Sequence, residues 1–352
     1  MKTVRRVLSF LSWTAVLALW GCAASVYVSP AVFRYAAPVG LMFPFFAAAV
    51  AAMGVLCLVI RPRLVWISIL GFIGCYGTVR DYFPVNLSSP PPKNSIMLMS
   101  YNTMACGGWE TEDGTLIVPR YVCESGADVA CMQEMGYRTD ADSIDIRRIG
   151  QRYGYHYDSE AFKGNRLAIL SRYPIVGKEK ICAREYNGAV AFRLLLRERD
   201  TLTVVNAHLT SMNLSATERQ SYHELVRNPE DADTIRGKLG IVRKIIHAGQ
   251  LRACLTDTLT DFLKHEAGRK LVLMGDFNDS PVSYAHHRVC SMLTDAYRAT
   301  GNGLGRSFNR DAICVRIDNI FCSAHFKPYA CSVLDDVPYS DHYPIVCYLK
   351  PQ

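Results

Sequence analysis

The residues best suited to chemistry in this chain stand at the ends of short apolar runs. The run 271–274 closes in Gly275, Asp276 and Asn278. A short apolar run that ends in a turn residue is typical of a buried strand, and a spacing of two places the Asp276 carboxylate and the Asn278 amide on one side of the chain. An acceptor and a donor fixed there could hold a water molecule beside a phosphoryl oxygen. A polar turn that merely closes a strand explains this motif alone equally well.

Five other apolar segments end in, or bury, the same kinds of side chain. They supply Asn102 after 96–101, Glu134 after 129–133, Asn206 and His208 within 202–209, Asp318 within 315–321, and Asp341 and His342 before 343–349. One buried polar residue is usually a satisfied structural group. Six strands that each carry Asn, Glu, His or Asp are hard to explain by packing alone, and they indicate a site built from several strands.

The order of these motifs resembles the endonuclease/exonuclease/phosphatase (DNase I-like) superfamily. Its members are metal-dependent phosphodiesterases and phosphatases, including DNase I-like nucleases, abasic-site endonucleases, neutral sphingomyelinases and inositol-polyphosphate phosphatases. The matching elements are Tyr-Asn (101–102), Gln-Glu (133–134), Ser-Arg-Tyr-Pro (171–174), Asn-x-His (206–208), Gly-Asp-Phe-Asn (275–278), Arg-Ile-Asp (316–318) and Ser-Asp-His (340–342). Each element is short, but together, in the superfamily's order, they form a strong signal.

The elements that position these residues alternate between strands and helices. Strands without strict alternation, interspersed with helices, predict an α/β fold with sheets buried on both faces. The resemblance implies a four-layer α/β/β/α sandwich of two packed β-sheets flanked by helices, preceded by N-terminal transmembrane helices. Expected strands are 95–102, 129–133, 166–171, 189–196, 201–208, 270–275, 315–321 and 343–349, and expected helices are 115–126, 142–152 and 232–266.

The resemblance implies a metal site. The glutamate that matches Glu134 is the main metal ligand in the superfamily, and the asparagine that matches Asn102 assists it. Carboxylate oxygen suits Mg²⁺, with Mn²⁺ as the alternative ion. Asp341 is expected to reach a second metal or to position water. The expected substrate is a phosphodiester or phosphomonoester, which could be a nucleic acid, a lipid headgroup or a small molecule.

The resemblance also implies groups that move protons. Asp276 is expected to orient or deprotonate the attacking water, and Asn278 to donate to a non-bridging phosphate oxygen. His342 is expected to contact the phosphate or shuttle a proton, with Asp318 fixing its tautomer. His208 matches a histidine of DNase I-like and sphingomyelinase-like members, although a core histidine bonded to a carbonyl would look the same in the sequence.

Other residues give weaker evidence about the functional site. Arg193, inside the apolar run 189–196, could bind a substrate phosphate, because a guanidinium among apolar residues needs an anionic partner. An arginine that faces a sheet edge explains it equally well. The adjacent pair His286 and His287 fits surface or helix residues, since neighbours on a helix do not face each other. The absence of a Cys-x-x-Cys pair argues against a zinc site.

The net charge of +7 belongs to the first 94 residues. They hold eight Lys or Arg residues and one acid, Asp81, whereas the rest of the chain holds 31 basic and 31 acidic residues. The C-terminal region therefore has no surplus for a broad phosphate-tracking surface, which tight nucleic-acid binders usually have. A local basic patch remains compatible with this balance.

Three apolar stretches lie in the same region, at 7–27, 38–60 and 64–79. The first two are long enough for a bilayer-spanning helix of ~20 residues, and the third is marginal. The basic residues cluster before the first stretch and between the second and third, which places residues from 80 onward outside the cytoplasm. A lipoprotein signal peptide ending at Cys22 is the alternative interpretation.

The chain is accordingly expected to have three parts. Residues 1–83 form a membrane anchor with about three transmembrane helices, 84–94 form a Pro-rich linker, and 95–352 form the hydrolase domain. The expected location is the bacterial inner membrane, multi-pass, with the catalytic domain on the extracytoplasmic (periplasmic) side. The lipid bilayer is the one expected partner besides the substrate, and no protein partner is identifiable.

The leading hypothesis is a membrane-anchored, metal-dependent hydrolase of phosphate esters, with nuclease and lipid-headgroup phosphodiesterase as its two forms. An inactive domain that binds phosphorylated ligands or proteins is the rival. A binding module has no need of proton-transfer groups, so the full set of polar residues favours the enzyme. Transport through the apolar stretches is disfavoured, because they contain no intramembrane charge.

Overall fold

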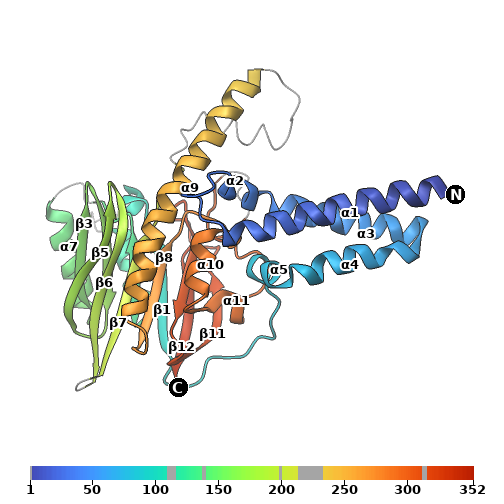
Figure 1. The fold of residues 1–352 in the computed structure, drawn as a ribbon. Helices are drawn as coiled ribbons and strands as arrows, with labels where there is room; N and C mark the ends of the chain where they lie inside the picture. The colour runs from blue at the N-terminus through green and yellow to red at the C-terminus, as the bar shows by residue number, and fades with distance from the viewer. Residues whose placement is uncertain (1, 109–115, 137–139, 198–199, 213–232, 311–314) are drawn as a thin grey trace.

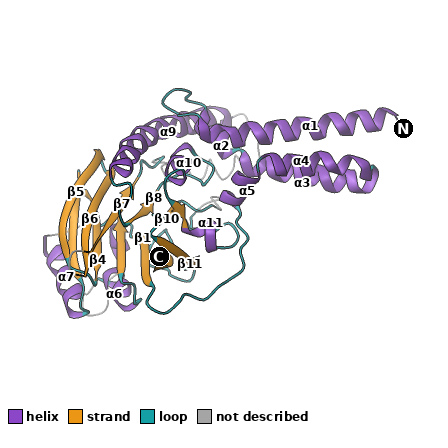
Figure 2. Cartoon of the chain, turned by 60° about the horizontal axis from the view of Figure 1, so that its bottom comes forward, coloured by secondary structure: helices purple, strands orange, loops and turns teal. Residues whose placement is uncertain are grey.

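Two β-sheets packed face to face form the body of the protein (Figure 1). The computed structural model describes residues 2–108, 116–136, 140–197, 200–212, 233–310 and 315–352. Helices cover the outer faces of both sheets, and apolar helices from the N-terminus extend to one side of the sandwich (Figure 2). The predicted four-layer α/β/β/α arrangement is therefore confirmed.

Each sheet has six strands. The first has the order β11-β12-β1-β2-β4-β3, with β1 (Ile96–Asn102), β2 (Val129–Gln133), β3 (His156–Phe162), β4 (Asn165–Ser171), β11 (Phe326–Val333) and β12 (Ile345–Pro351). The second has the order β5-β6-β7-β8-β10-β9, with β5 (Ile175–Arg184), β6 (Asn187–Arg197), β7 (Asp200–His208), β8 (Leu271–Asp276), β9 (Thr294–Asp295) and β10 (Asp318–Cys322). One pair in each sheet is parallel, β1 with β2 and β7 with β8, and the other pairs are antiparallel.

The core has three layers of apolar contact. Between the sheets, inward-facing side chains such as Leu98, Phe192 and Met274 form one cluster. Helices α6 (Ile117–Glu124) and α7 (Asp140–Arg152) cover the first sheet, and α9 (Asp233–His265) and α10 (Tyr284–Cys290) cover the second. Short α11 (Ala296–Thr300) packs against β10 and β11. Both faces of each sheet are thus buried, which explains why most strands lack a polar face.

The predicted elements are present, with differences at their ends. Residues 315–317 precede β10 rather than belonging to it, and residues 115 and 232 lie outside the described part. Four strands were not predicted, namely β3, β5, β9 and β11, nor were α10 and α11. Strand β5 is an edge strand whose exposed positions carry Lys and Glu, so its hydrophobic pattern is weak.

The N-terminal module is a bundle of apolar helices. It contains α1 (Lys2–Ala24), α2 (Ala36–Leu41), α3 (Phe43–Ile60), α4 (Val65–Gly74) and α5 (Tyr76–Tyr82). Two helical segments are long and apolar enough to cross a membrane. The first, 2–27, is α1 with the short 3₁₀ helix Ser25–Tyr27, and the second, 36–60, is α2 followed by α3. The third predicted span is broken, because the helical segments 62–74 and 76–82 meet at 70°. Val16, Val50 and Ile67 are fully buried where the helices pack together.

This module is attached to the sandwich by specific contacts. Asp81 of α5 forms an ion pair with Arg298 of α11 at 3.0 Å. In the segment after α5, the Asn86 side chain donates hydrogen bonds to the carbonyl oxygens of Arg298 and Gly301. The ring of Tyr27 meets that of His287 edge-to-face with centroids 4.5 Å apart. No disulfide joins the cysteines that the structure describes.

Candidate active site

Asp276, the last residue of β8, is the centre of a polar cluster. Its Oδ2 atom accepts hydrogen bonds from the Nδ2 atoms of Asn102 and Asn278, at 3.0 and 3.1 Å. The Nε2 atoms of His208 and His342 each lie 3.7 Å from the same oxygen. One carboxylate oxygen therefore contacts four side chains from four segments of the chain.

Strand pairing brings these residues together. β7 and β8 run parallel with His208 opposite Asp276, and β10 runs antiparallel to β8 with Asp318 opposite Asp276. In the other sheet β1 and β2 run parallel, so Asn102 and Glu134 leave it at the same edge. Two parallel neighbouring strands end at the same edge of a sheet, and an antiparallel neighbouring strand begins at that edge. Residues far apart in the sequence therefore meet at one edge of the sandwich.

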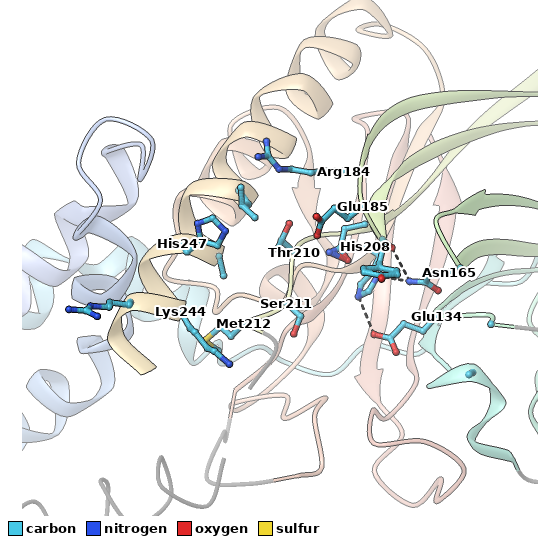
Figure 3. A pocket seen from close by; sticks show the side chains of 18 residues that line it. Glu134, Asn165, Arg184, Glu185, His208, Thr210, Ser211, Met212, Lys244 and His247 are labelled. Carbon is cyan, nitrogen blue, oxygen red and sulfur yellow. Dashed lines mark hydrogen bonds and ion pairs between the residues drawn. The ribbon is translucent and has the colours of Figure 1, made fainter. Parts of the chain in front are cut away.

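The partly exposed Glu134 contacts the buried His208 at one side of the cluster. Glu134 Oε1 accepts a hydrogen bond from Asn102 Nδ2 at 3.1 Å and lies 3.3 Å from His208 Nε2. The other ring nitrogen of His208, Nδ1, lies 3.3 Å from the Asn165 amide, as Figure 3 shows. The His208 ring is thereby held between an amide and a carboxylate. The Glu134 side chain remains 37% exposed, whereas that of Asp276 is fully buried.

His342 and Asp318 form the buried part. His342 Nδ1 donates to Asp318 Oδ2 at 2.8 Å, which leaves Nε2 directed toward Asp276. Ser307 Oγ accepts a hydrogen bond from the backbone N–H of Asp318 at 3.1 Å. The ring of Phe308 meets the His342 ring edge-to-face at 5.0 Å. The imidazole orientation is therefore fixed by a carboxylate on one side and an aromatic ring on another.

The backbone at this edge is unusual. Glu134 and Asn278 both have positive φ, at 54° and 49°, a region that residues with a side chain rarely adopt. Gly275, with φ of 152°, lies so close to β7 that an added Cβ would be 1.9 Å from the Ala207 carbonyl oxygen. Such conformations cluster at functional sites, where surrounding structure enforces them. Here they turn Glu134 and Asn278 out of their strands toward Asp276.

The contact between Glu134 and His208 shifts the pKa values of both groups. Burial disfavours the ionised Glu134 carboxylate, but His208 beside it outweighs this and lowers the pKa to about 2. Burial likewise disfavours a charged His208 ring, but Glu134 and Asp276 raise its pKa above the usual value. The two shifts agree in direction, since each partner stabilises the charged form of the other.

The pKa values of Asp276 and His342 depend on Asp318 as well as on burial. Burial, together with repulsion from Asp318, raises the pKa of Asp276 to about 6, against the opposing effect of the two histidines. Burial disfavours the charged form of His342, but Asp318 and Asp276 outweigh it and raise the pKa to about 10. A carboxyl group poised near neutrality next to an imidazolium suits proton transfer.

A cavity of about 690 Å³ opens from the cluster (Figure 3). Glu134 and His208 line its inner end. Its other walls come from the β3–β4 and β5–β6 turns, the segment after β7 and one face of α9. These lining residues are Gly164, Asn165, Arg184, Glu185, Tyr186, Asn187, Thr210, Ser211, Met212, Arg243, Lys244, His247, Ala248 and Leu251, with Ala105 and Gly136 beside Glu134.

Seven of the candidate residues thus lie together, namely Asn102, Glu134, His208, Asp276, Asn278, Asp318 and His342. Asp341 lies next to His342 in the chain, and its carboxylate Oδ2 is 3.7 Å from Nε of Arg310. Its proposed role with a second metal stays a prediction. His286 is a helix residue, as expected, but its ring is buried and bonded to Asp295.

Arg193 does not join the cluster, and its assignment as a phosphate ligand is corrected. Its guanidinium NH1 lies 2.5 Å from Glu266 Oε2, and it also donates to Thr203. Strand pairing places Arg193 opposite Thr203, five residues along β7 from His208. The anionic partner that an arginine among apolar residues needs is therefore Glu266 of the segment after α9, not a substrate.

Two sets of residues at the site were not predicted. Asn165 begins β4 and contacts His208, but a single asparagine after a glycine looks like a turn in the sequence. Arg184, Arg243 and Lys244 reach the cavity from two distant elements. The buried Asn206, predicted as part of a polar strand end, instead bridges the two sheets by donating to the carbonyls of Met132 and Ala168.

The residues fit a bound cation. Asp276, Asp318 and His342 each have a possible ligand atom within 4.8 Å of the others, and the His342 ring would coordinate only in its neutral form. Asp318 Oδ1 is buried and has no hydrogen-bond partner among the described residues. Both hydrogens of the Asn102 amide are directed at carboxylates, so its oxygen is the atom left for a ligand, and it accepts only a 3.2 Å bond from the Met104 N–H. Converging carboxylates with an unused oxygen are a donor set for a hard cation.

The two-sheet sandwich and the polar cluster at its edge define a class of protein, the α/β/β/α hydrolases of phosphate esters. Comparison with known proteins agrees with this class. Residues 99–342 match a model described as the Endonuclease/Exonuclease/phosphatase family. The chain belongs to this family and is an enzyme that hydrolyses phosphate esters.

Other comparisons extend this result. The human Nocturnin catalytic domain, solved with a bound sulfate anion, is 18% identical, covers 76% of this chain and 96% of its own, and gives a TM-score of 0.53. An endonuclease/exonuclease/phosphatase family protein from Bacteroides thetaiotaomicron is 17% identical, covers 74% and 98%, and gives 0.50. Residues 5–82 match a model described as a domain of unknown function (DUF8431). No curated protein matches the chain.

Proposed function

We propose that this chain is a membrane-anchored, divalent-metal-dependent phosphodiesterase. The observation that carries the proposal is the convergence of two amides and two imidazoles on Asp276 Oδ2, with Glu134 and Asp318 one contact further out. Packing alone does not require two amides, two imidazoles and three carboxylates at one strand edge. A phosphate ester needs charge neutralisation, an aligned water and a proton for the leaving oxygen, and these groups can supply all three.

Asp276 accepts the proton of the attacking water in this proposal. Its pKa of about 6 keeps it largely ionised at neutral pH while leaving it able to hold a proton. His342, cationic through its contact with Asp318, neutralises a phosphate oxygen or protonates the leaving oxygen. The Asn278 amide donates to Asp276 and to the Leu209 carbonyl, so contact with a phosphate oxygen requires one of these bonds to be exchanged.

Mg²⁺ is the proposed cofactor, with Mn²⁺ as the alternative. Glu134 and Asn102 would hold it, since the partly exposed Glu134 carboxylate is ionised across the physiological pH range and the Asn102 oxygen is the amide atom not bonded to a carboxylate. A bound divalent cation supplies Lewis acidity that neutralises the charge of the phosphate oxygens. Asp341 is proposed to hold a second ion or a water.

The proposed membrane location rests on the length and apolar composition of the N-terminal helices. We propose an anchor at 1–83, a linker at 84–94 and a hydrolase domain at 95–352. Lys2, Arg5 and Arg6 at the start of α1 favour a cytoplasmic N-terminus. The hydrolase domain would then lie on the extracytoplasmic side of a bacterial inner membrane. Protease added to intact spheroplasts should digest this domain, and full protection would overturn the orientation.

The activity is tested with full-length protein in detergent micelles. With Mg²⁺ it should hydrolyse bis-p-nitrophenyl phosphate, EDTA should abolish turnover, and added Mg²⁺ should restore it. Asp276→Asn and His342→Asn should each lower kcat on the order of 10²–10⁴-fold in protein that still unfolds in one cooperative thermal transition. Turnover that survived Asp276→Asn would remove this carboxylate from the mechanism. Binding of phosphate esters without turnover would support the rival, an inactive binding module.

A further inference from the structure

The cavity beside the cluster is where one substituent of the substrate phosphate can lie. Glu134 and His208 close its inner end, next to Asp276, and the rest extends along α9 and the β5–β6 turn. A phosphodiester that reacts at Asp276 has two substituents to accommodate, and this cavity ends at His208, whose Nε2 lies 3.7 Å from Asp276 Oδ2. The residues that line the cavity therefore meet the part of the substrate next to the scissile phosphate.

The cavity is basic away from the cluster. Arg184 extends from the end of β5, and Arg243 and Lys244 from α9, with Glu185 as the one acid among the described lining residues besides Glu134. Figure 3 shows Arg184 and His247 on different walls of the cavity, with Lys244 toward its outer end. The remaining lining includes apolar Met212, Ala248 and Leu251. Such walls suit an amphiphile that has an anionic group.

The same stretch of α9 rests on the N-terminal module. Gly249, next to the lining residue Ala248, packs so closely on α2 that an added Cβ would lie 2.6 Å from Ala37 Cβ and 3.7 Å from Pro30 Cβ. Figure 1 shows α2 lying across α9 beside the end of α1. One wall of the cavity therefore packs on Ala37, at the start of the second helix that can span a membrane, and on Pro30 of the connection that precedes it.

That connection has the composition of a membrane surface. Val32 is 87% exposed and Phe33 50%, and Tyr35 is exposed beside them. The Arg34 guanidinium lies 4.8 Å from the Tyr35 ring centroid and donates to its hydroxyl. Aromatic and arginine side chains at the ends of spans anchor a protein in the headgroup region. In the proposed membrane topology, the wall that packs on this segment would lie at the bilayer surface.

We infer that the substrate is a lipid phosphoester presented by the bilayer, whose headgroup enters this cavity and places its anionic part near Arg243 and Lys244. The inference rests on the proposed function and names its substrate class. Water adds to the phosphorus, the P–O bond to one substituent breaks, and the leaving oxygen takes up a proton. One product remains in the bilayer and the other leaves through the cavity. The neutral overall charge of residues 95–352 also gives a long nucleic acid no broad surface to follow.

The test compares the same lipid headgroup in a bilayer vesicle and in a water-soluble short-chain lipid. Full-length protein is reconstituted with Mg²⁺ into vesicles that contain phosphatidylinositol 4-phosphate, whose headgroup carries an anionic group beyond the scissile phosphate, and water-soluble products are followed by ³¹P NMR. Vesicles of phosphatidylglycerol and phosphatidylethanolamine, whose headgroups carry no such group, are the matched comparison. The dihexanoyl form of phosphatidylinositol 4-phosphate, kept below its micellar concentration, serves as the soluble counterpart, and bis-p-nitrophenyl phosphate and plasmid DNA as further substrates. We expect vesicle lipid to be cleaved at least about tenfold faster than its short-chain counterpart.

Variants locate the effect in the cavity. The double change Arg243→Gln and Lys244→Gln should lower the ratio of vesicle-lipid to bis-p-nitrophenyl phosphate hydrolysis about tenfold. Lys264→Gln, on the same helix but outside the cavity, should leave both rates unchanged. A ratio that did not change in the double variant would overturn the headgroup assignment.

The outcomes also separate this inference from the proposed function. Hydrolysis of bis-p-nitrophenyl phosphate or DNA, with vesicle lipid cleaved no faster than its short-chain form, overturns the lipid assignment and leaves the phosphodiesterase intact. Loss of hydrolysis for every substrate, in protein with a normal unfolding midpoint, overturns the proposed function and the inference with it.

Discussion

His342 Nδ1 lies 2.8 Å from Asp318 Oδ2, and this contact joins a loop to the first residue of β10. Asp318 is also the direct strand partner of Asp276, so one carboxylate sets the position of an imidazole whose far nitrogen points at another carboxylate. The three groups form a chain in which the outer carboxylate orients the ring and favours its charged form.

Asp318→Asn should therefore impair turnover more than binding. The amide keeps the shape but removes the charge that holds His342 in its cationic, oriented state. We expect kcat to fall on the order of 10²-fold with KM changed less than about threefold, measured by steady-state hydrolysis of bis-p-nitrophenyl phosphate. Asp336→Asn, at an exposed position, is the control and should leave both constants unchanged. If kcat/KM fell by the same factor because KM rose while kcat stayed unchanged, Asp318 would instead act in substrate binding.

The ion pair between Arg193 and Glu266 yields a prediction about stability. Glu266 is buried and accepts bonds from Arg193 and Thr203, so Arg193→Gln leaves a buried carboxylate short of its partner. We expect the free energy of unfolding to fall by about 1–3 kcal/mol, seen as a lower thermal midpoint, with kcat and KM unchanged.

Arg120→Gln is the matched control for that change. Arg120 pairs with Glu124 at 2.8 Å, but both side chains are nearly half exposed. An exposed pair contributes about 0–1 kcal/mol, so this variant should unfold close to the parent midpoint. A rise in KM for Arg193→Gln would show that Arg193 does bind the substrate phosphate.

Gly275 provides a test of the backbone at the site. An added Cβ would overlap the Ala207 carbonyl of the neighbouring strand, and φ of 152° disfavours any side chain there. Gly275→Ala should lower the free energy of unfolding by several kcal/mol or prevent folding. Gly177→Ala in β5 of the same sheet is the control, because its nearest neighbour, Arg193 Cγ, is 3.7 Å away. Equal midpoints for the two variants would contradict the close approach of β7 and β8.

Much of this site was predictable because its polar residues stand at the ends of apolar strands, and neighbouring strand ends lie close together in a sheet. Apolar runs closed by Asp276, Asn102 and His208 are strong local signals, and the pairing of parallel strands brings their ends to one edge. The resemblance to a known family then fixed the sandwich and the order of strands. The convergence of these residues needed no information beyond the motifs and that fold.

What the sequence did not reveal depends on distant contacts. The partner of Arg193 is Glu266, 73 residues away, and only the docking of α9 on the sheet brings them together. The basic lining of the cavity also combines β5 with α9. In edge strand β5 the charged run 178–180 interrupts the apolar residues, so no strand pattern is recognisable. Local patterns report which residues are buried, but not which distant segment buries them.

His286 leads to a prediction about pH. Its buried ring lies 2.9 Å from Asp295 Oδ2, which also accepts a bond from Arg316. Burial disfavours the charged ring, but Cys290 and Asp295 favour it and raise the pKa to about 10. Because the folded-state pKa lies above the ordinary value of about 6.5, the stabilisation is complete below pH 6.5 and is lost as the pH rises toward 10.

His286→Asn should remove this contribution. We expect its thermal midpoint to lie on the order of 5–10 °C below that of the parent at pH 6, with the gap narrowing steadily between pH 6.5 and 10. Comparing the two proteins at each pH cancels the titration of groups they share. The exposed His265→Asn should show no pH-dependent gap. A gap that stayed constant from pH 6 to pH 10 would mean that His286 stabilises the fold through packing or neutral hydrogen bonds rather than through the charge of its ring.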